Sequence, residues 1–461
     1  MGSERISALA PLYDEVAKCG KCGFCQPTCP VYRTTFREGH VARGKNALFR
    51  NLVEGETVLD VDLRDSFDHC LLCRACTAAC FPAVRTDQLV LAFRETYARR
   101  FGRPTLQRLI FRGLLPFPDR MRLVIRAAWT ARRLGLDSLA ARAGLLDMIN
   151  PKLRNALEIK EDVPARFLRD RAADTGLGRP SARTVERGPA PLRVGYWISC
   201  GYNYMLPEVG EATLEALRQI GASVEILGNA CCGLPVYGYG DRDGARSLAR
   251  RNIELLGDLS RFDAVVSECG SCSGHLKEYP DLLADDPEFS VRAHRLAAMT
   301  RSFSEFVDPL LARTADLAPP PAAPDGDPDR PLVVTYHEPC HLGARYQGVV
   351  TQPRRILKSL PGVEYRELPE ADSCCGAAGS FNVLHPEVAG GILARKMERV
   401  AAIGADVLVT ECPACLLQLG LGVRRAGLPV RVAGISELVV SYSTGQRRAG
   451  SDRNGIRGGV E

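Results

Sequence analysis

The sequence predicts an α+β multidomain chain in which a helical, cysteine-rich module precedes a duplicated α/β unit. Three observations support this fold class: the eighteen cysteines fall into four groups, two groups share one short spacing, and the other two repeat each other. The 461 residues, 46% of them hydrophobic and 25% charged, suffice for about three domains of roughly 150 residues each. This composition excludes disordered, collagen-like and small disulfide-stapled chains.

The first two groups each read C-x2-C-x2-C-x3-C, a ferredoxin run in which three closely spaced thiolates bind one [4Fe-4S] cluster. Where two such runs occur, the fourth cysteine of each ligates the other cluster. We predict one cluster on Cys19, Cys22, Cys25 and Cys80, and a second on Cys70, Cys73, Cys76 and Cys29. Structural zinc, the alternative, normally uses two separated C-x2-C pairs. Because residues 31–69 show no strand alternation, we expect a helical double [4Fe-4S] ferredoxin domain over residues 8–100.

Residues 101–190 are predicted to form a helical, basic connector. Between residues 101 and 160, ten Arg and two Lys stand against four Asp or Glu, a local charge of +8 compared with +6 for the whole chain. Apolar residues such as Leu123 and Trp129 are mixed with these arginines. The pattern is typical either of a basic amphipathic helix on an anionic membrane, or of a solvated face that packs on the cluster module or on an acidic partner subunit.

The last two groups belong to an internal repeat. Cys200 and Cys340 lie 140 residues apart, and the other members of the two groups lie 143 residues apart. In each copy a β-rich run (192–199 and 332–339) ends at or beside the first cysteine, a second run (224–227 and 363–368) precedes a C-C-G triplet, and a third (264–267 and 406–410) leads into E-C-x2-C. Strands alternating with helices predict a parallel sheet with ligand sites at the carboxyl ends of its strands.

We place the first cysteine-rich repeat at residues 191–315 and the second at residues 332–440. A proline-rich segment, residues 316–331, is expected to be an extended linker between them, and residues 441–461 a disordered tail.

Each repeat is predicted to hold a metal site built from five cysteines. The predicted ligands are Cys200, Cys231, Cys232, Cys269 and Cys272 in the first repeat, and Cys340, Cys374, Cys375, Cys412 and Cys415 in the second. An ordinary cube needs four ligands, so either one cysteine per repeat is spare or the cluster is not cubane. Gly233 and Gly376 follow the cysteine pairs, where the backbone is expected to approach a cluster closely or to take a positive φ.

Histidines and glutamates adjoin these predicted ligands: His275, His337, His341, Glu268, Glu338 and Glu411. The histidines could hydrogen-bond a cluster sulfur or relay a proton, but we favour the alternative of a packing role. Repetition of Glu268 and Glu411 in both copies indicates structural duplication more than catalysis. The catalytic residues, if the chain has any, stay unknown from the sequence.

The double ferredoxin run followed by two copies of C-C-G-x35-C-x2-C resembles the cysteine-rich-domain iron-sulfur proteins. That family includes the catalytic subunits of heterodisulfide reductase and the iron-sulfur subunits of glycolate oxidase, lactate-utilisation systems and anaerobic glycerol-3-phosphate dehydrogenase. Beyond the cysteines, the segments KCGKCGFCQPTCPVYR, HCLLCRACTAAC and RPTLQRLIFRGLLPFPDR are most similar to the glycolate oxidase iron-sulfur subunit. Such subunits often have thinned C-terminal cysteine sets, whereas both sets here are complete. The resemblance to heterodisulfide reductase therefore implies noncubane clusters as the alternative to cubes.

The resemblance implies an iron-sulfur oxidoreductase subunit that takes electrons from an FAD-containing partner oxidising glycolate or lactate and passes them to quinone or another carrier. A heterodisulfide reductase-like enzyme with disulfide chemistry at the C-C-G sites is the second hypothesis, and a metal-stabilised, non-redox scaffold is the third. The expected cofactors are two [4Fe-4S] clusters in the first module and one or two more in the repeats. No G-x-G-x-x-G opens a helix after a strand, so the flavin is expected on the partner.

We expect a cytoplasmic chain that is at most peripheral on the inner face of the membrane. No run reaches the ~18 apolar residues of a membrane-spanning helix, and the start lacks the pattern of a signal peptide. The mild net charge of +6 and the absence of an aromatic-and-basic motif argue against nucleic acid as a partner.

Overall fold

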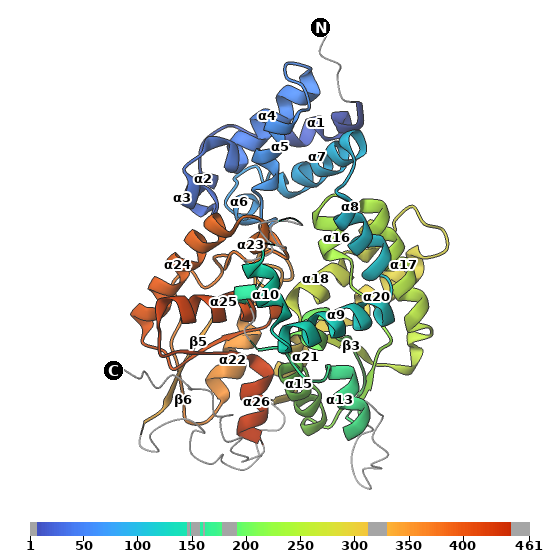
Figure 1. Cartoon of the computed structure of the whole chain (residues 1–461), viewed down its shortest axis with the longest axis vertical. Coiled ribbons are helices and arrows are strands. Elements are labelled where there is room, and N and C mark those ends of the chain that lie inside the picture. Colours follow the sequence, from blue (N-terminus) through green and yellow to red (C-terminus); the bar gives the residue numbers. More distant parts are fainter. Residues whose placement is uncertain are drawn as a thin grey trace.

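The computed structural model describes residues 7–144, 148, 157–159, 162–177, 191–311 and 330–443. The predicted linker before residue 330 and most of the predicted tail lie outside the described residues. The helical module lies at one end of the molecule, the two repeats lie side by side below it, and the connector crosses their front (Figure 1).

The first module is helical, as predicted. Its helices are α1 (Tyr13–Ala17), α2 (Cys25–Thr28), α3 (Tyr32–Thr35), α4 (Ala42–Glu54), α5 (Val61–Asp68), α6 (Ala75–Ala78) and α7 (Thr86–Phe101). Leu9, in the 3-10 helix Ser7–Leu12, and Phe49, in α4, are buried in the apolar core of the module, and the rings of Phe67 and Phe93 stack with their centroids 3.7 Å apart. The short helix α2 contains Cys25 of the first ferredoxin run and the short helix α6 contains Cys76 of the second; the two helices contact each other, which brings the two runs together.

The connector is also helical in its described parts. It contains α8 (Thr105–Arg108), a π-helical turn (Leu109–Leu114), α9 (Pro118–Arg133), α10 (Leu136–Arg142) and α13 (Leu168–Thr175). Arg122 and Arg126 on α9 pair with Asp170 on α13 at 2.6 and 3.0 Å. On the outer side of α9, Leu123 is 71% exposed and no residue of the helix is fully buried.

Each repeat contains a four-stranded parallel sheet. The strands of the first are β1 (Arg193–Tyr196), β2 (Ser223–Ile226), β3 (Ala264–Ser267) and β4 (Thr300–Ser302), in the order β2-β1-β3-β4. Those of the second are β5 (Leu332–Tyr336), β6 (Val363–Tyr365), β7 (Val407–Thr410) and β8 (Arg431–Gly434), in the order β6-β5-β7-β8. The registers match, since Val194 pairs with Ala264 in one sheet as Val334 pairs with Val407 in the other. The parallel sheets were predicted, but the outer strands β4 and β8 were missed because, unlike the other strands, neither leads into a cysteine motif.

Helices cover both sheets. In the first repeat they are α14 (Cys200–Tyr204), α15 (Pro207–Gln219), α16 (Leu234–Gly238), α17 (Arg242–Leu256), α18 (Gly270–Lys277), α19 (Tyr279–Leu282), α20 (Ser290–Met299) and α21 (Phe303–Leu311). In the second they are α22 (Thr351–Ser359), α23 (Phe381–Leu384), α24 (Pro386–Ile403), α25 (Pro413–Ala426) and α26 (Ile435–Ser443), the last of which extends three residues into the predicted tail. No helix in the described ranges is long and apolar enough to cross a membrane.

The two repeats pack against each other through their helices. The last helix of each repeat packs on the first long helix of the other, α26 on α15 and α21 on α22. Side chains from both sheets, including Tyr196 and Tyr336, share one buried core. The interface is therefore approximately symmetric, as duplication of one unit would produce.

At this interface Gly201 of the first repeat meets Pro413 of the second, and a Cβ added at Gly201 would lie 2.5 Å from the proline Cβ. We expect Gly201→Ala to destabilise the chain by about 1–3 kcal/mol, because the rigid proline ring cannot yield. The matched control is Gly390→Ala on α24, where the nearest atom lies 4.0 Å from the new Cβ. It should be neutral or slightly stabilising in the helix. Thermal unfolding would show this difference, and equal melting temperatures would contradict the close contact.

Candidate iron-sulfur sites

The cysteines of each repeat lie at the carboxyl ends of neighbouring strands. In the first repeat Cys200 begins α14 after β1, the pair Cys231–Cys232 follows β2, and Cys269 follows β3 with Cys272 inside α18. The second repeat places its five cysteines in the same way after β5, β6 and β7. Because the strands are parallel, their carboxyl ends share one edge, and loops far apart in sequence meet there.

Both C-C-G triplets turn through a left-handed glycine. Gly233 has φ +94° and Gly376 has φ +90°, a region that other residues adopt at a cost. A Cβ at Gly376 would lie 3.0 Å from the carbonyl oxygen of Ala389. The prediction of positive φ at these two positions is confirmed.

Within each set the thiols adjoin one another in the same order. In the first repeat the order is Cys200, Cys231, Cys232, Cys272 and Cys269. In the second it is Cys340, Cys374, Cys375, Cys415 and Cys412. The Sγ atoms of Cys375 and Cys415 are 3.6 Å apart. Thus the structure brings all five cysteines of each predicted set together.

The two five-cysteine sets also meet each other. Cys269 adjoins Cys412, the equivalent residue of the other repeat. Around this contact the backbone N–H of Gly270 donates to the carbonyl oxygen of Glu411 at 3.0 Å, and Ser271 Oγ lies 3.7 Å from Cys412 Sγ. The ten thiols therefore form one continuous series rather than two isolated groups.

The outer end of the second set meets the ferredoxin module. Cys73 is buried in the same apolar cluster as Cys374, and Cys340 packs against that cluster. Arg74, next to Cys73, fixes this junction: it donates to Asp87 and to Glu278 of the first repeat, both at 2.8 Å, and its guanidinium lies 3.5 Å from the centroid of the Tyr346 ring.

Inside the ferredoxin module the two runs are interleaved. Burial raises the pKa of Cys76, and the nearby Cys70 and Cys29 raise it further, which places Cys29 of the first run beside the second run. Cys80 packs, like Cys19, against the helical core of the module. The position of Cys29 is the one that the exchanged ligand set requires, and the full assignment of ligands stays a prediction.

Two buried lysines lie beside these thiols. Lys45 donates to the carbonyl oxygen of His40, and burial lowers its pKa whereas Cys70 and Cys29 raise it. Lys396 donates to the carbonyl oxygen of Glu370 at 2.7 Å, and burial lowers its pKa to about 8 although Cys375 opposes the shift. Neither has a carboxylate ion-pair partner among the described residues. The sequence does not single out either lysine. The available signal was that each lysine occupies a position on the otherwise mainly apolar, buried face of its helix.

Unpartnered polar atoms point to an absent group at these sites. Both ring nitrogens of His337 are buried without a hydrogen-bond partner in the described chain, and a ring nitrogen lies within 4.8 Å of the sulfurs of Cys375 and Cys415. Trp197, the equivalent residue 140 positions earlier, has a buried and unpartnered Nε1. Buried donors normally find acceptors. The unpartnered ring nitrogens of His337 therefore favour hydrogen bonding to a cluster over the packing role that we favoured from the sequence.

The buried glutamates before the E-C-x2-C cysteines join the repeats. Glu268 accepts a 2.7 Å hydrogen bond from Ser436 Oγ on α26, and Glu411 accepts a 3.1 Å hydrogen bond from the backbone N–H of Ser304 on α21. Burial raises the pKa of Glu268 and raises that of Glu411 to about 8. Each glutamate therefore caps the last helix of the other repeat, in keeping with the structural role predicted for them. Glu338 instead pairs with Arg354 at 2.8 Å.

These observations test whether the residues fit iron-sulfur clusters. The donors are thiols only, the adjoining NH groups lack acceptors, and buried cations lie close by. Clusters with thiolate ligands are anionic and are tuned by such hydrogen bonds and charges, so the residues fit.

Comparison with known proteins agrees with this geometry. The family model "Cysteine-rich domain" matches residues 194–277 and 334–420, "4Fe-4S dicluster domain" matches residues 15–83, and "Glycolate oxidase iron-sulfur subunit, linker region" matches residues 102–159. The chain is 34% identical over 429 residues to the probable glycolate oxidase iron-sulfur subunit of Bacillus subtilis, covering 91% of this chain and 92% of that protein.

Two further relatives match the chain in part. A subunit of the fumarate reductase (CoM/CoB) of Methanothermobacter marburgensis is 33% identical over 58% of this chain and 50% of its own length. Lactate utilization protein A 2 of Bacillus mycoides is 31% identical over 55% of this chain and all of its own length.

Replacing Lys396 with Met should lower the reduction potential of a cluster in the second repeat, because a buried positive charge favours the reduced, more negative state. The potential is measured by a redox titration followed by electron paramagnetic resonance (EPR). Lys358→Met, at an exposed lysine on α22, is the matched control and should leave the potential unchanged. Equal shifts in both variants would contradict a local effect of Lys396.

Contact between Cys269 and Cys412 predicts that clusters in the two repeats interact magnetically. The EPR spectrum of the fully reduced chain should be broadened or split, and removing the first site with Cys232→Ser should leave a simpler spectrum from the second. Cys22→Ser, which affects the distant end of the ferredoxin module, should preserve the splitting. A wild-type spectrum that equals the sum of independent clusters would disprove the interaction.

Proposed function

Because the chain belongs to the family of the glycolate oxidase iron-sulfur subunits, we propose that it is the electron-transferring subunit of a complex that oxidises a 2-hydroxy acid. The substrate class follows from the relatives, whose names refer to glycolate and to lactate. An FAD-containing subunit is the proposed partner, and quinone or another carrier the proposed acceptor.

One observation carries this proposal: the four predicted metal sites form a linear series. The ferredoxin module adjoins the second repeat through Cys73 and Cys374, and the second repeat adjoins the first through Cys412 and Cys269. All eighteen cysteines lie among the described residues, and of these only Cys22 and Cys200 are exposed. Those two belong to sites at opposite ends of the series. A series whose two exposed cysteines lie at its opposite ends is suited to carrying electrons between two partners.

The proposed ligands are those predicted from the sequence. Cys19, Cys22, Cys25 and Cys80 hold one cluster of the ferredoxin module, Cys70, Cys73, Cys76 and Cys29 hold the other, and each five-cysteine set holds a further cluster. Bound [4Fe-4S] clusters would supply one-electron transfer. The chain's own residues bury the thiols, offset their charge through Lys45 and Lys396, hold His337 beside Cys375 and Cys415, and pack Trp197 in the buried cluster that contains Cys231 and Cys232.

A second candidate function is disulfide chemistry at the repeats. Three observations favour it: both five-cysteine sets are complete, Cys200 is exposed, and the chain resembles the fumarate reductase (CoM/CoB) subunit over 270 residues. We rank it second because the match to the glycolate oxidase subunit covers nearly the whole of both chains.

For location, we propose that the chain works in the cytoplasm and that any contact with the inner face of the membrane uses the connector. Leu123 and Leu134 are 71% and 68% exposed on or next to α9, and exposed arginines such as Arg120 lie beside them. Apolar and basic side chains on one exposed surface suit an anionic lipid interface.

The metal content of the protein tests the assignment of cofactors. Anaerobically purified protein should be brown, with iron and acid-labile sulfide for at least two and at most four [4Fe-4S] clusters, one for each site described above. Cys73→Ser should lose one cluster and destabilise the ferredoxin module, since metal binding contributes to folding. Colourless protein with stoichiometric zinc would overturn both candidate functions.

The place of the flavin tests the proposed function itself. The isolated chain should bind no FAD and should oxidise neither glycolate nor lactate, whereas a flavoprotein should co-purify with it. Adding that flavoprotein and its hydroxy acid should reduce the clusters, as seen by bleaching of their visible absorption. Stoichiometric flavin on the single chain, or failure of the complex to reduce the clusters, would contradict the proposal.

A further inference from the structure

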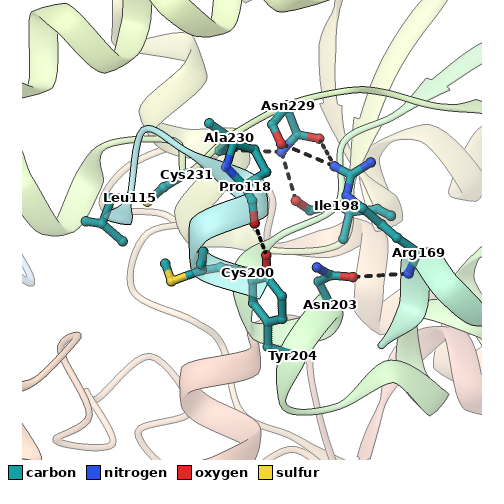
Figure 2. A pocket seen from close by; sticks show the side chains of 11 residues that line it. Leu115, Pro118, Arg169, Ile198, Cys200, Asn203, Tyr204, Asn229, Ala230 and Cys231 are labelled. Carbon is teal, nitrogen blue, oxygen red and sulfur yellow. Dashed lines mark hydrogen bonds between the residues drawn. The ribbon is translucent and has the colours of Figure 1, made fainter. Parts of the chain in front are cut away.

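A small hollow of about 30 Å³ lies beside the exposed Cys200 (Figure 2). Cys200 and Cys231 of the first five-cysteine set line it. The polar residues around it comprise one cation, two amides and one phenol, and no carboxylate: Arg169, Asn203, Asn229 and Tyr204. Apolar side chains of the connector, including Leu115 and Met121, complete the lining. This combination suits a small molecule with a negative charge and an apolar portion.

The positive charge of Arg169 has no ionic partner among the described residues. Its guanidinium donates to the carbonyl oxygens of Leu227 and Asn229, at 2.7 and 3.2 Å, and to the side-chain oxygen of Asn229. The adjacent carboxylate, Asp170, turns instead to Arg122 and Arg126. Burial lowers the pKa of Arg169, as expected for a charge that is held by neutral groups alone. An anion in the hollow would offset this charge.

Pseudo-symmetry shows why the two repeats differ at this place. Cys340 and Cys374 are the equivalents of Cys200 and Cys231, and the ferredoxin module covers them with Cys73. In the first repeat the connector occupies the corresponding side, where the backbone N–H of Cys231 donates to the carbonyl oxygen of Leu115 at 3.4 Å. The connector thus forms a rim, and it leaves Cys200 accessible.

We propose that this hollow binds a low-molecular-weight organic anion against the first five-cysteine site, with Arg169 as the residue that selects its charge. The inference rests on the proposed function, because it assigns a ligand to one end of the same series. A small anionic molecule, rather than a protein, fits this end since the contact lies inside a hollow and not on a flat surface.

Two thiols of similar size test the proposal: mercaptoacetate, which is anionic, and 2-mercaptoethanol, which is neutral. Each is titrated into the reduced, iron-loaded chain while the EPR spectrum is recorded, because a sulfur ligand near the first site changes the signal of that cluster. Mercaptoacetate should act at about tenfold lower concentration than 2-mercaptoethanol, the difference expected for one charge-assisted hydrogen bond.

Two variants in the hollow should abolish this preference. Arg169→Gln removes the charge, and Asn203→Asp adds a carboxylate while keeping the oxygen that accepts from the Arg169 backbone N–H at 3.1 Å. The second variant keeps the test decisive if the first fails to fold. Arg345→Gln is the matched control near the second set, since Arg345 is already paired with Asp372, and it should keep the tenfold preference.

Equal potency of the two thiols on the wild type, or an unchanged preference in the folded hollow variants, would overturn the anion site. Iron content and reduction by the flavoprotein partner are measured on the same samples. A chain that is loaded and reduced but shows no preference overturns this inference alone. If the chain carries iron-sulfur clusters but the partner cannot reduce them, the proposed function is overturned, and the anion site is then decided by the titration alone. If the repeats bind no iron, both proposals are overturned.

Discussion

The two E-C-x2-C turns pack against each other, and the rest of the structure is arranged around that contact. It joins Cys269 to Cys412 and is fixed by the hydrogen bond from the backbone of Gly270 to that of Glu411. Because Glu268 and Glu411 each cap a helix of the other repeat, the strands that carry the cysteines cannot move apart without exposing a buried carboxyl group. The interface between the repeats therefore fixes the distance between the two five-cysteine sites.

Concentrating so many thiols has an electrostatic cost, and the chain offsets it with buried groups. Thiolates in a dry interior repel one another, and buried positive charges or directed NH groups stabilise them. Lys45 lies beside the thiols of the ferredoxin module, while Lys396 and His337 lie beside those of the second repeat. The first repeat has Trp197 in place of His337, and its cation, Arg169, lines a hollow that opens to solvent.

Duplication supplied two equal units, and their neighbours made them different. The ferredoxin module covers the outer end of the second repeat, whereas the connector only borders that of the first. One copy therefore became an internal member of the series and the other became an end. The same ligand set can hold a relay or a terminal site, depending on what packs against its first cysteine.

The sequence by itself determined the grouping of the cysteines, the duplication and the parallel sheets, because these depend on local spacing: C-x2-C places two sulfurs on one turn, and alternating strands and helices impose a parallel sheet. It did not reveal β4 and β8, which lead into no cysteine motif and are held by pairing with β3 and β7. Nor did it reveal the contact of Cys269 with Cys412, the roles of Lys45 and Lys396, or the hollow at Cys200. Those features arise between residues 16 to 143 positions apart, so only the packing of the folded chain decides them.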